Sequence, residues 1–308
     1  MPAKASPREC DAMKKPQPKP RIYAILARES PFAVIFRRGP SKRVLLIGWN
    51  TSNDSFQIGQ WLKGRIYERR CDLSPDGELL IYCAANQRAP MYSWTAISRP
   101  PFLTALALWR KGDVWGGGGH FLSQHRVALN HWESQMKVED GFTLPKWLRV
   151  EPFGKHPGKG EDDPIWPVRL QRDGWTLVSF PTTTKYDFNA KVAWEPSPAI
   201  TWRKQNPKWP KKYSLNMSII GMKEKNGPWY MTEHSVLRNE KDLDYLGRSD
   251  WADWDHSGDL LFARDGCVYR LRCHRGILEP LEDAKEIADF STMEFEPRGA
   301  PPEALRWK

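Results

Sequence analysis

The chain has 308 residues, a net charge of +10 and an apolar fraction of 40%, with 16 Trp, 9 Tyr and 12 Phe. This content is enough to bury a substantial core and is too aromatic for a disordered chain. No stretch reaches the roughly 20 apolar residues of a membrane-spanning helix, and no secretory leader pattern opens the sequence, so we expect a cytoplasmic protein without a membrane span. The positive charge permits nucleic acid, an acidic protein or an anionic membrane surface as a partner, and it demands none of them.

The cysteines support the same cellular location. Their number is odd and no Cys-x-x-Cys pair occurs among Cys10, Cys71, Cys83, Cys267 and Cys273. Free thiols in a reducing compartment are therefore the simplest interpretation.

The order of segments predicts one long domain between two loose ends. Residues 1–20 are rich in Lys and Pro, which favours an extended and disordered tail. Strand-like apolar runs follow at residues 22–27, 32–36 and 43–49. We expect a single domain over residues 21–296 and a loose, proline-rich tail over residues 297–308.

Turn signals continue along the chain. A glycine stands beside Asp or Asn between apolar runs five times, a pattern typical of hairpins because the turn needs positive φ. These positions are Asp76-Gly77, Gly112-Asp113, Asp173-Gly174, Asn226-Gly227 and Asp265-Gly266. We therefore expect residues 168–170 and 175–180 to pair as strands around Asp173. The intervals of roughly 40–60 residues suit four-stranded units, about five or six in number. One short C-terminal helix is expected at residues 281–290, where apolar residues have helical spacing.

Two segments share an order of strand, polar turn ending in Gly, and apolar strand: residues 71–82 and 253–263. The block Ser74-Pro75-Asp76-Gly77 resembles the blade motif of tryptophan–aspartate-repeat (WD40-like) β-propellers and their bacterial relatives. Residues 99–109 and 115–119 also resemble an uncharacterised bacterial protein family, which supplies no activity. The resemblance implies an all-β, propeller-like ring whose end faces bind other molecules. A β-sandwich is the alternative.

The first functional hypothesis is a non-catalytic scaffold that binds a protein partner through its end-face loops. Trp and Arg are enriched at binding hot spots. The expected contact residues are Trp109, Arg110, Trp115 and Trp209. No cofactor and no catalytic residue is expected.

The second hypothesis is single-stranded nucleic-acid binding through the basic aromatic segment 202–213, because cations neutralise phosphates while aromatic rings stack on bases. The expected contact residues are Trp202, Arg203, Lys204, Lys208, Trp209, Lys211 and Lys212. Strand alternation would place Trp202 and Arg203 on opposite faces, which favours a structural role for the tryptophan.

The third hypothesis is a metal-assisted hydrolase. His120, His125 and His131 could converge from loops on a zinc ion, although their spacing does not place them on one helix face. The nearby glycines at residues 116–119 lack the Gly-Lys-Ser/Thr pattern of a phosphate-binding loop and indicate a tight turn. The acidic run at residues 161–163 indicates a solvated loop.

Overall fold

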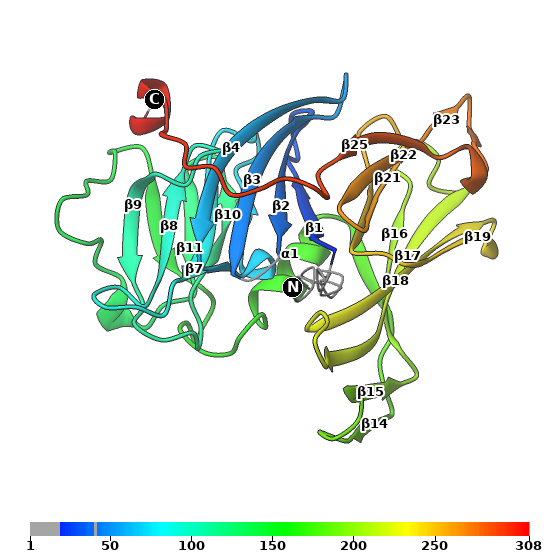
Figure 1. Ribbon diagram of the computed structural model, residues 1–308, viewed down its shortest axis with the longest axis horizontal. Coiled ribbons are helices and arrows are strands. Elements are labelled where there is room, and N and C mark those ends of the chain that lie inside the picture. The colour runs from blue at the N-terminus through cyan, green and yellow to red at the C-terminus, as the bar shows by residue number, and fades with distance from the viewer. Residues whose placement is uncertain (1–18, 40–41, 308) are drawn as a thin grey trace, which may run out of the picture.

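The computed structural model describes residues 19–39 and 42–307 (Figure 1). In this part of the chain six β-sheets dominate, and α1 (Ile165–Arg172) is the single α-helix. This confirms the prediction of an all-β protein built from several mainly antiparallel sheets. Most of the predicted tail at residues 1–20, including Cys10, lies outside the described residues.

Sheet A is an antiparallel meander of the first four strands in the order β1-β2-β3-β4. Its strands are β1 (Arg21–Leu26), β2 (Phe32–Arg38), β3 (Arg43–Asn50) and β4 (Ser55–Lys63). The three strand-like runs predicted in this region are confirmed. β2 and β3 are buried along nearly their whole length, because both faces of sheet A are covered by other sheets.

Sheet B follows, and its turn matches the predicted Asp76-Gly77 reversal. It contains β5 (Arg65–Ile66), β6 (Asp72–Leu73), β7 (Leu80–Ala85), β8 (Ser93–Ser98) and β9 (Ala105–Arg110), with the short 3-10 helix η1 (Glu68–Arg70). The Ser74 hydroxyl donates to Asp76 Oδ1 at 2.6 Å, and that same oxygen accepts the N–H of Glu78 at 2.9 Å. Gly77 has φ +79°, as this turn requires.

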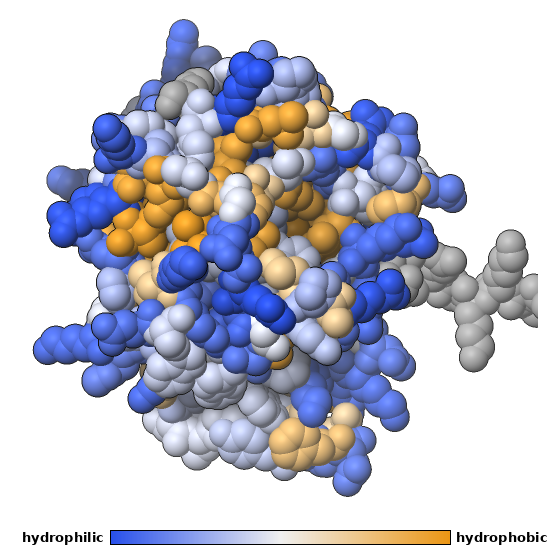
Figure 2. All heavy atoms as spheres, turned by 90° about the vertical axis from the view of Figure 1, so that its left-hand side faces the viewer, coloured by the Kyte–Doolittle hydropathy of each residue, from blue (hydrophilic) through white to orange (hydrophobic). Residues whose placement is uncertain are grey.

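Sheet C departs from a purely antiparallel pattern. It consists of β10 (Gly119–Ser123), β11 (Arg126–Leu129) and β12 (Arg149–Pro152), with the 3-10 helix η2 (Glu133–Gln135) between the last two. β11 and β12 run parallel. Seen from the side of sheets B and C, the surface is mostly hydrophilic, with a band of hydrophobic side chains across its upper part (Figure 2).

α1 replaces the strand that was expected before Asp173-Gly174, so that prediction was wrong. Ile165, Trp166, Arg169 and Leu170 are buried, a spacing that suits one side of a helix. The turn at Asp173 does end this element, and a strand follows it as predicted, but the partner of that strand lies elsewhere.

Sheet D is the largest sheet and has seven strands. They are β13 (Trp175–Ser179), β14 (Thr183–Tyr186), β15 (Val192–Ser197), β16 (Ile200–Gln205), β17 (Tyr213–Glu224), β18 (Tyr230–Arg238) and β19 (Lys241–Arg248). β14 and β15 project at the lower end of this sheet in Figure 1.

Sheet E corrects the expected C-terminal helix at residues 281–290. Its strands are β20 (Trp251–Trp254), β21 (Leu260–Arg264), β22 (Cys267–Leu271) and β25 (Lys285–Asp289). Only the single 3-10 turn η3 (Leu281–Asp283) is helical in that region. β25 instead hydrogen-bonds β22, and Ile287 and Phe290 pack in the cluster shared with sheet A, which outweighs a weak local helix preference.

Three small elements complete the fold. They are the hairpin of β23 (Cys273–His274) and β24 (Ile277–Leu278), and the 3-10 helix η4 (Pro302–Leu305). In the last segment Ala304 is buried and Trp307 Nε1 donates to the carbonyl of Thr143 at 3.1 Å.

The sheets pack on one another in chain order through separate apolar clusters. Sheet A shares one cluster with sheet B and another with sheet E, sheet B shares one with sheet C, and sheet D shares one with sheet E. α1 lies between sheets C and D, because Ile165 packs on Ala128 and Phe153 while Trp166 and Leu170 join the cluster of sheet D. Sheet A therefore stands in the middle of Figure 1, between B and C on one side and D and E on the other.

Candidate functional site

The residues expected to bind a protein partner do not share one surface role. Trp109 is fully buried and donates from Nε1 to the carbonyl of Met136, so its side chain is not accessible at the surface. Arg110 on β9 is exposed, as are Trp115 and Trp209. Trp209 belongs to the loop after β16, far along the chain from the other residues.

The basic aromatic segment is largely occupied by internal contacts. Trp202 is buried in the cluster of sheets D and E. Arg203 bonds Glu240 at 2.7 Å, Lys204 bonds Asp253 at 2.7 Å, and Lys212 donates to the carbonyl of Gly276. The exposed members of the expected set are Lys208, Trp209 and Lys211.

The three histidines are not brought together. In the part of the chain that the structure describes, the one group of possible metal ligands with atoms within 4.8 Å of one another is Cys267, Glu286 and Asp289. Burial lowers the pKa of His120 and of His131 to about 4 each, whereas His125 is exposed. His131 Nε2 instead hydrogen-bonds a hydroxyl of sheet B at 2.8 Å.

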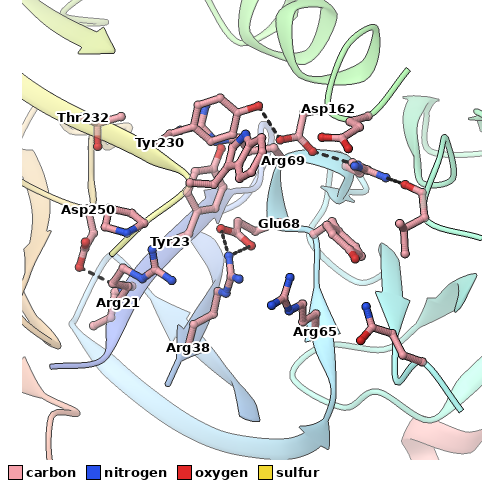
Figure 3. Close-up of a pocket in the computed structure, with 18 residues that line it drawn as sticks. Arg21, Tyr23, Arg38, Arg65, Glu68, Arg69, Asp162, Tyr230, Thr232 and Asp250 are labelled. Atoms are coloured by element: carbon pink, nitrogen blue, oxygen red, sulfur yellow. Dashed lines mark hydrogen bonds and ion pairs between the residues drawn. The ribbon is translucent and has the colours of Figure 1, made fainter. Parts of the chain in front are cut away.

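A different set of residues converges on a pocket of about 270 Å³ (Figure 3). Elements from both halves of the chain line it: the start of β1, the end of β2, β5 with η1, the loop around Asp162, and the start of β18. Five arginines belong to its lining: Arg21, Arg38, Arg65, Arg69 and Arg70. Such a concentration of guanidinium groups is typical of sites that recognise carboxylates or phosphates.

Local structure explains how the arginines meet. The antiparallel register of β1 and β2 places Arg21 directly opposite Arg38. After β5, η1 turns the chain so sharply that Arg69 and Arg70 are both buried, although they are neighbours in the sequence. Arg65 precedes this turn and is exposed.

Two of the five arginines are neutralised by carboxylates. Arg38 Nη1 donates to both oxygens of Glu68, at 2.8 and 3.0 Å. Arg70 Nε donates to Asp162 Oδ1 at 2.9 Å, and its Nη1 donates to the carbonyls of Val114 and Gly116, both at 2.8 Å. The glycine loop therefore holds an arginine, and the acidic run contributes a buried ion pair rather than a wholly solvated loop.

The other three arginines have no carboxylate hydrogen-bonded to them among the described residues. Arg69 is 7% exposed and lies between the rings of Trp166 and Tyr230, with its guanidinium carbon 3.7 Å from each ring centroid. These cation–π contacts hold the side chain in place, but its Nη1 is buried without a hydrogen-bond partner in the described structure. Arg21 and Arg65 complete this set at the pocket.

Three of the five arginines have no hydrogen-bonded carboxylate among the described residues, and this determines the electrostatics of the pocket. Burial, and then the neighbouring charge of Arg38, lower the pKa of Arg21. Burial raises the pKa of Asp250 to about 6, although its Oδ2 accepts the N–H of Ile22 at 3.2 Å. Glu161, the remaining carboxylate of the lining, is exposed. Near neutral pH the pocket therefore presents positive charge that internal ion pairs do not cancel.

The pocket adjoins a second cavity of about 420 Å³ between sheets A, D and E and α1. Tyr23, Arg69, Thr232 and Asp250 line both, so they form a shared wall. On the outer side Trp229 is exposed and contacts Trp194 edge-on, with ring centroids 5.8 Å apart. The arginine pocket thus has Arg69, held between two aromatic rings, in its inner wall and the exposed ring of Trp229 at its outer side.

The sequence contained a partial signal for this site. Arg37-Arg38 and Arg69-Arg70 are visible as basic clusters, but nothing local indicates that they meet or that Arg21 and Arg65 join them. No protein-family model and no curated protein matches the chain. The resemblance of residues 71–82 to propeller motifs accordingly stays a prediction. The longest helix in the described part of the chain, α1, has eight residues, and none there has the length and apolar character to cross a membrane.

Proposed function

We propose that this protein is a non-catalytic interaction module that binds an acidic segment of a protein partner at the arginine pocket. The observation that carries the proposal is that Arg21, Arg65 and Arg69 line one pocket and that no carboxylate among the described residues is hydrogen-bonded to them. An acidic segment would supply the missing counter-charges. Guanidinium groups stay protonated near neutral pH, so they bind and orient anions rather than transfer protons.

We further infer that the scaffold is a propeller-like ring of five sheets rather than a β-sandwich. Support comes from the order of packing, since sheet A packs on sheet B, sheet B on sheet C, sheet D on sheet E, and sheet E on sheet A. The helix α1 would join sheets C and D in that ring. In such an architecture the pocket lies at one end face, where loops from several sheets meet.

The overall charge suits an acidic partner. A net charge of +10 accelerates encounter with an anionic surface, and a pocket with uncompensated charge then fixes the register of the complex. The exposed Trp229 at the rim is of the residue type that most often contributes strongly to binding.

The experiment that tests the proposal compares capture of partners in the native cell. Tagged wild-type protein is compared with the double variant Arg21→Glu/Arg65→Glu, and Arg149→Glu on sheet C is the control with the same type of charge change away from the pocket. The partner is identified, purified and titrated. We expect the double variant to bind it at least tenfold more weakly and the control to bind within twofold of wild type. Equal binding by all three proteins would exclude the pocket as the docking site.

A further inference from the structure

We propose that the arginine pocket binds a phosphomonoester dianion, carried by a phosphorylated side chain of the partner. This inference rests on the proposed function and names the chemical group that the pocket selects. It follows from the arrangement of three guanidinium groups at the mouth, one buried cation in the floor, and the size of the cavity.

The mouth of the pocket is a row of guanidinium groups. Figure 3 labels Arg21, Arg38 and Arg65 in the lining, each from a different strand; the register of β1 and β2 sets Arg21 opposite Arg38, and Glu68 bonds Arg38. Glu68 bonds one of these three arginines, so Arg21 and Arg65 keep guanidinium groups that no carboxylate bonds in the described structure. A guanidinium group offers planar pairs of N–H donors that match two oxygens of one anion. Two such groups suit a dianion with three terminal oxygens better than a carboxylate with two.

The floor of the pocket contributes a charge that cannot move away. Arg69 is fixed between two aromatic rings, so it does not swing toward solvent when no anion is bound. A buried cation without a hydrogen-bonded counter-charge is destabilising. A doubly charged ligand at the mouth would offset this more than a singly charged one, because the interaction scales with ligand charge.

The carboxylates of the lining do not reverse the preference of the pocket for a doubly charged anion. Glu68 and Asp162 are each engaged by an arginine, and Glu161 is exposed to solvent. Asp250 is a half-buried carboxylate without an arginine bonded to it in the described lining. The set therefore resembles an anion site with one repulsive group rather than a closed network of ion pairs.

The volume of the pocket limits the ligand. At about 270 Å³ it lies just below the roughly 300–1,000 Å³ of pockets for drug-sized ligands, so it suits a phosphoryl group with a short stem. The exposed ring of Trp229 at the rim offers an apolar contact for the organic group beyond the phosphate. We therefore favour a phosphorylated side chain over free phosphate and over the terminal phosphate of a nucleic acid.

Calorimetric titration of the full-length protein tests the chemistry. The probes are inorganic phosphate, a short phosphoserine peptide, the same peptide with glutamate in place of phosphoserine, and a 5′-phosphorylated oligonucleotide. We expect the phosphopeptide to bind at least tenfold more tightly than the glutamate peptide and more tightly than inorganic phosphate. Equal affinity for both peptides would overturn the inference, and preference for the oligonucleotide or for inorganic phosphate would overturn the peptide assignment.

Variants distinguish binding at the pocket from attraction by the net positive charge of the protein. Arg21→Gln/Arg65→Gln should lower phosphopeptide affinity at least tenfold, whereas Arg149→Gln should leave it within twofold. Arg65→Gln alone, at an exposed position, should lower affinity at least threefold and serves if the double variant does not fold. Unchanged affinity in Arg65→Gln would overturn the inference.

Phosphatase treatment distinguishes this inference from the proposed function. A captured partner that needs Arg21 and Arg65 should lose at least tenfold in affinity when dephosphorylated. If it still binds through these arginines after treatment, the phosphomonoester inference fails and the proposed function stands. If its capture never depends on them, the proposed function fails, whatever the result with the phosphopeptide.

Discussion

Two sites in this molecule contain a buried arginine, but they differ in how many carboxylates bond to it. Around Arg270 on β22, all five N–H donors are used within the chain. Nε and one Nη2 proton bond Asp54 at 3.0 and 2.7 Å, Nη1 bonds Asp255 at 2.5 Å and Asp259 at 2.9 Å, and Nη2 also bonds the carbonyl of Thr51 at 2.7 Å. Three carboxylates surround one cation, so this site needs nothing from outside the chain.

In the arginine pocket, by contrast, no described carboxylate bonds the buried Arg69. Arg69 is buried as deeply, but aromatic rings hold it instead of carboxylates, and Arg21 and Arg65 at the mouth have no bonded acid in the described structure. A buried charge whose hydrogen bonds are satisfied within the chain supports the fold, whereas an unsatisfied one reduces stability, and such exceptions are expected at functional or strained sites. The distribution of acids, and not the number of arginines, therefore separates the satisfied site around Arg270 from the pocket that we propose as a binding site.

The largest expected effect comes from removing the satisfied arginine. Arg270→Ala would leave Asp54, Asp255 and Asp259 close together without their cation, and we expect a loss of about 3–5 kcal/mol in the free energy of unfolding. Arg65→Ala, at the pocket, should change it by less than ~0.5 kcal/mol. Urea denaturation of both variants measures the two losses, and similar losses would contradict the distinction between a satisfied and an unsatisfied arginine site.

A second prediction concerns how the pocket is held in place. Gly118 has φ +81°, and a Cβ there would lie 2.3 Å from the carbonyl oxygen of Arg70 and 2.6 Å from its Cβ. We expect Gly118→Ala to cost about 3 kcal/mol or more and to weaken anion binding, because the loop would move off the arginine.

Gly112 provides a matched control for the glycine substitution. Its φ is +80°, but no atom lies within 4 Å of the added Cβ. Gly112→Ala should therefore cost only the backbone strain, about 1 kcal/mol. Equal urea midpoints for the two alanine variants would show that the loop does not press on Arg70.

Much of the fold could be predicted because its signals are local. The two repeated turns illustrate this: Ser74 and Asp76 form one, while Asp255 and Ser257 form the other with hydroxyl and carboxylate exchanged. In both, the carboxylate oxygen accepts the hydroxyl proton at 2.6 Å, and glycine follows with positive φ. Such turns depend on four or five neighbouring residues, so the sequence is enough to place them.

The site could not be predicted, because its geometry depends on contacts between distant segments. Arg37 and Arg38 alternate on β2, so the first is buried against the carbonyl of Phe290 while the second reaches the pocket. The ring that clamps Arg69 from sheet D comes from Tyr230, whose position follows from tertiary packing alone. The error at residues 281–290 has the same origin, since pairing with β22 decides the structure of that segment.

The last prediction concerns the pH dependence of stability at Asp250, where we expect a smaller change. Burial raises the pKa of Asp250 to about 6, so this carboxyl becomes neutral in the folded protein as the pH falls below 6. Its folded-state pKa lies above the ordinary value, so the associated stability is present at low pH and is lost as the pH rises through about 6. Asp250→Asn should therefore unfold at a higher urea concentration than wild type at pH 7.5, and at about the same concentration at pH 4.

Protonation of Asp250 should also change the affinity of the pocket for anions. Sulfate keeps its two charges between pH 5 and 8, so a change in its affinity reports the protein and not the ligand. The charged groups that act on Asp250 are Arg21 on β1, Arg248 on β19 and Asp265 after β21. Loss of one negative charge at the pocket should strengthen sulfate binding about threefold from pH 7.5 to pH 5.5, or roughly 0.6 kcal/mol. Asp250→Asn should bind sulfate with the higher affinity at both pH values. A pH dependence that persists in this variant would assign the effect to another group and remove Asp250 from the balance of charges that separates the two arginine sites.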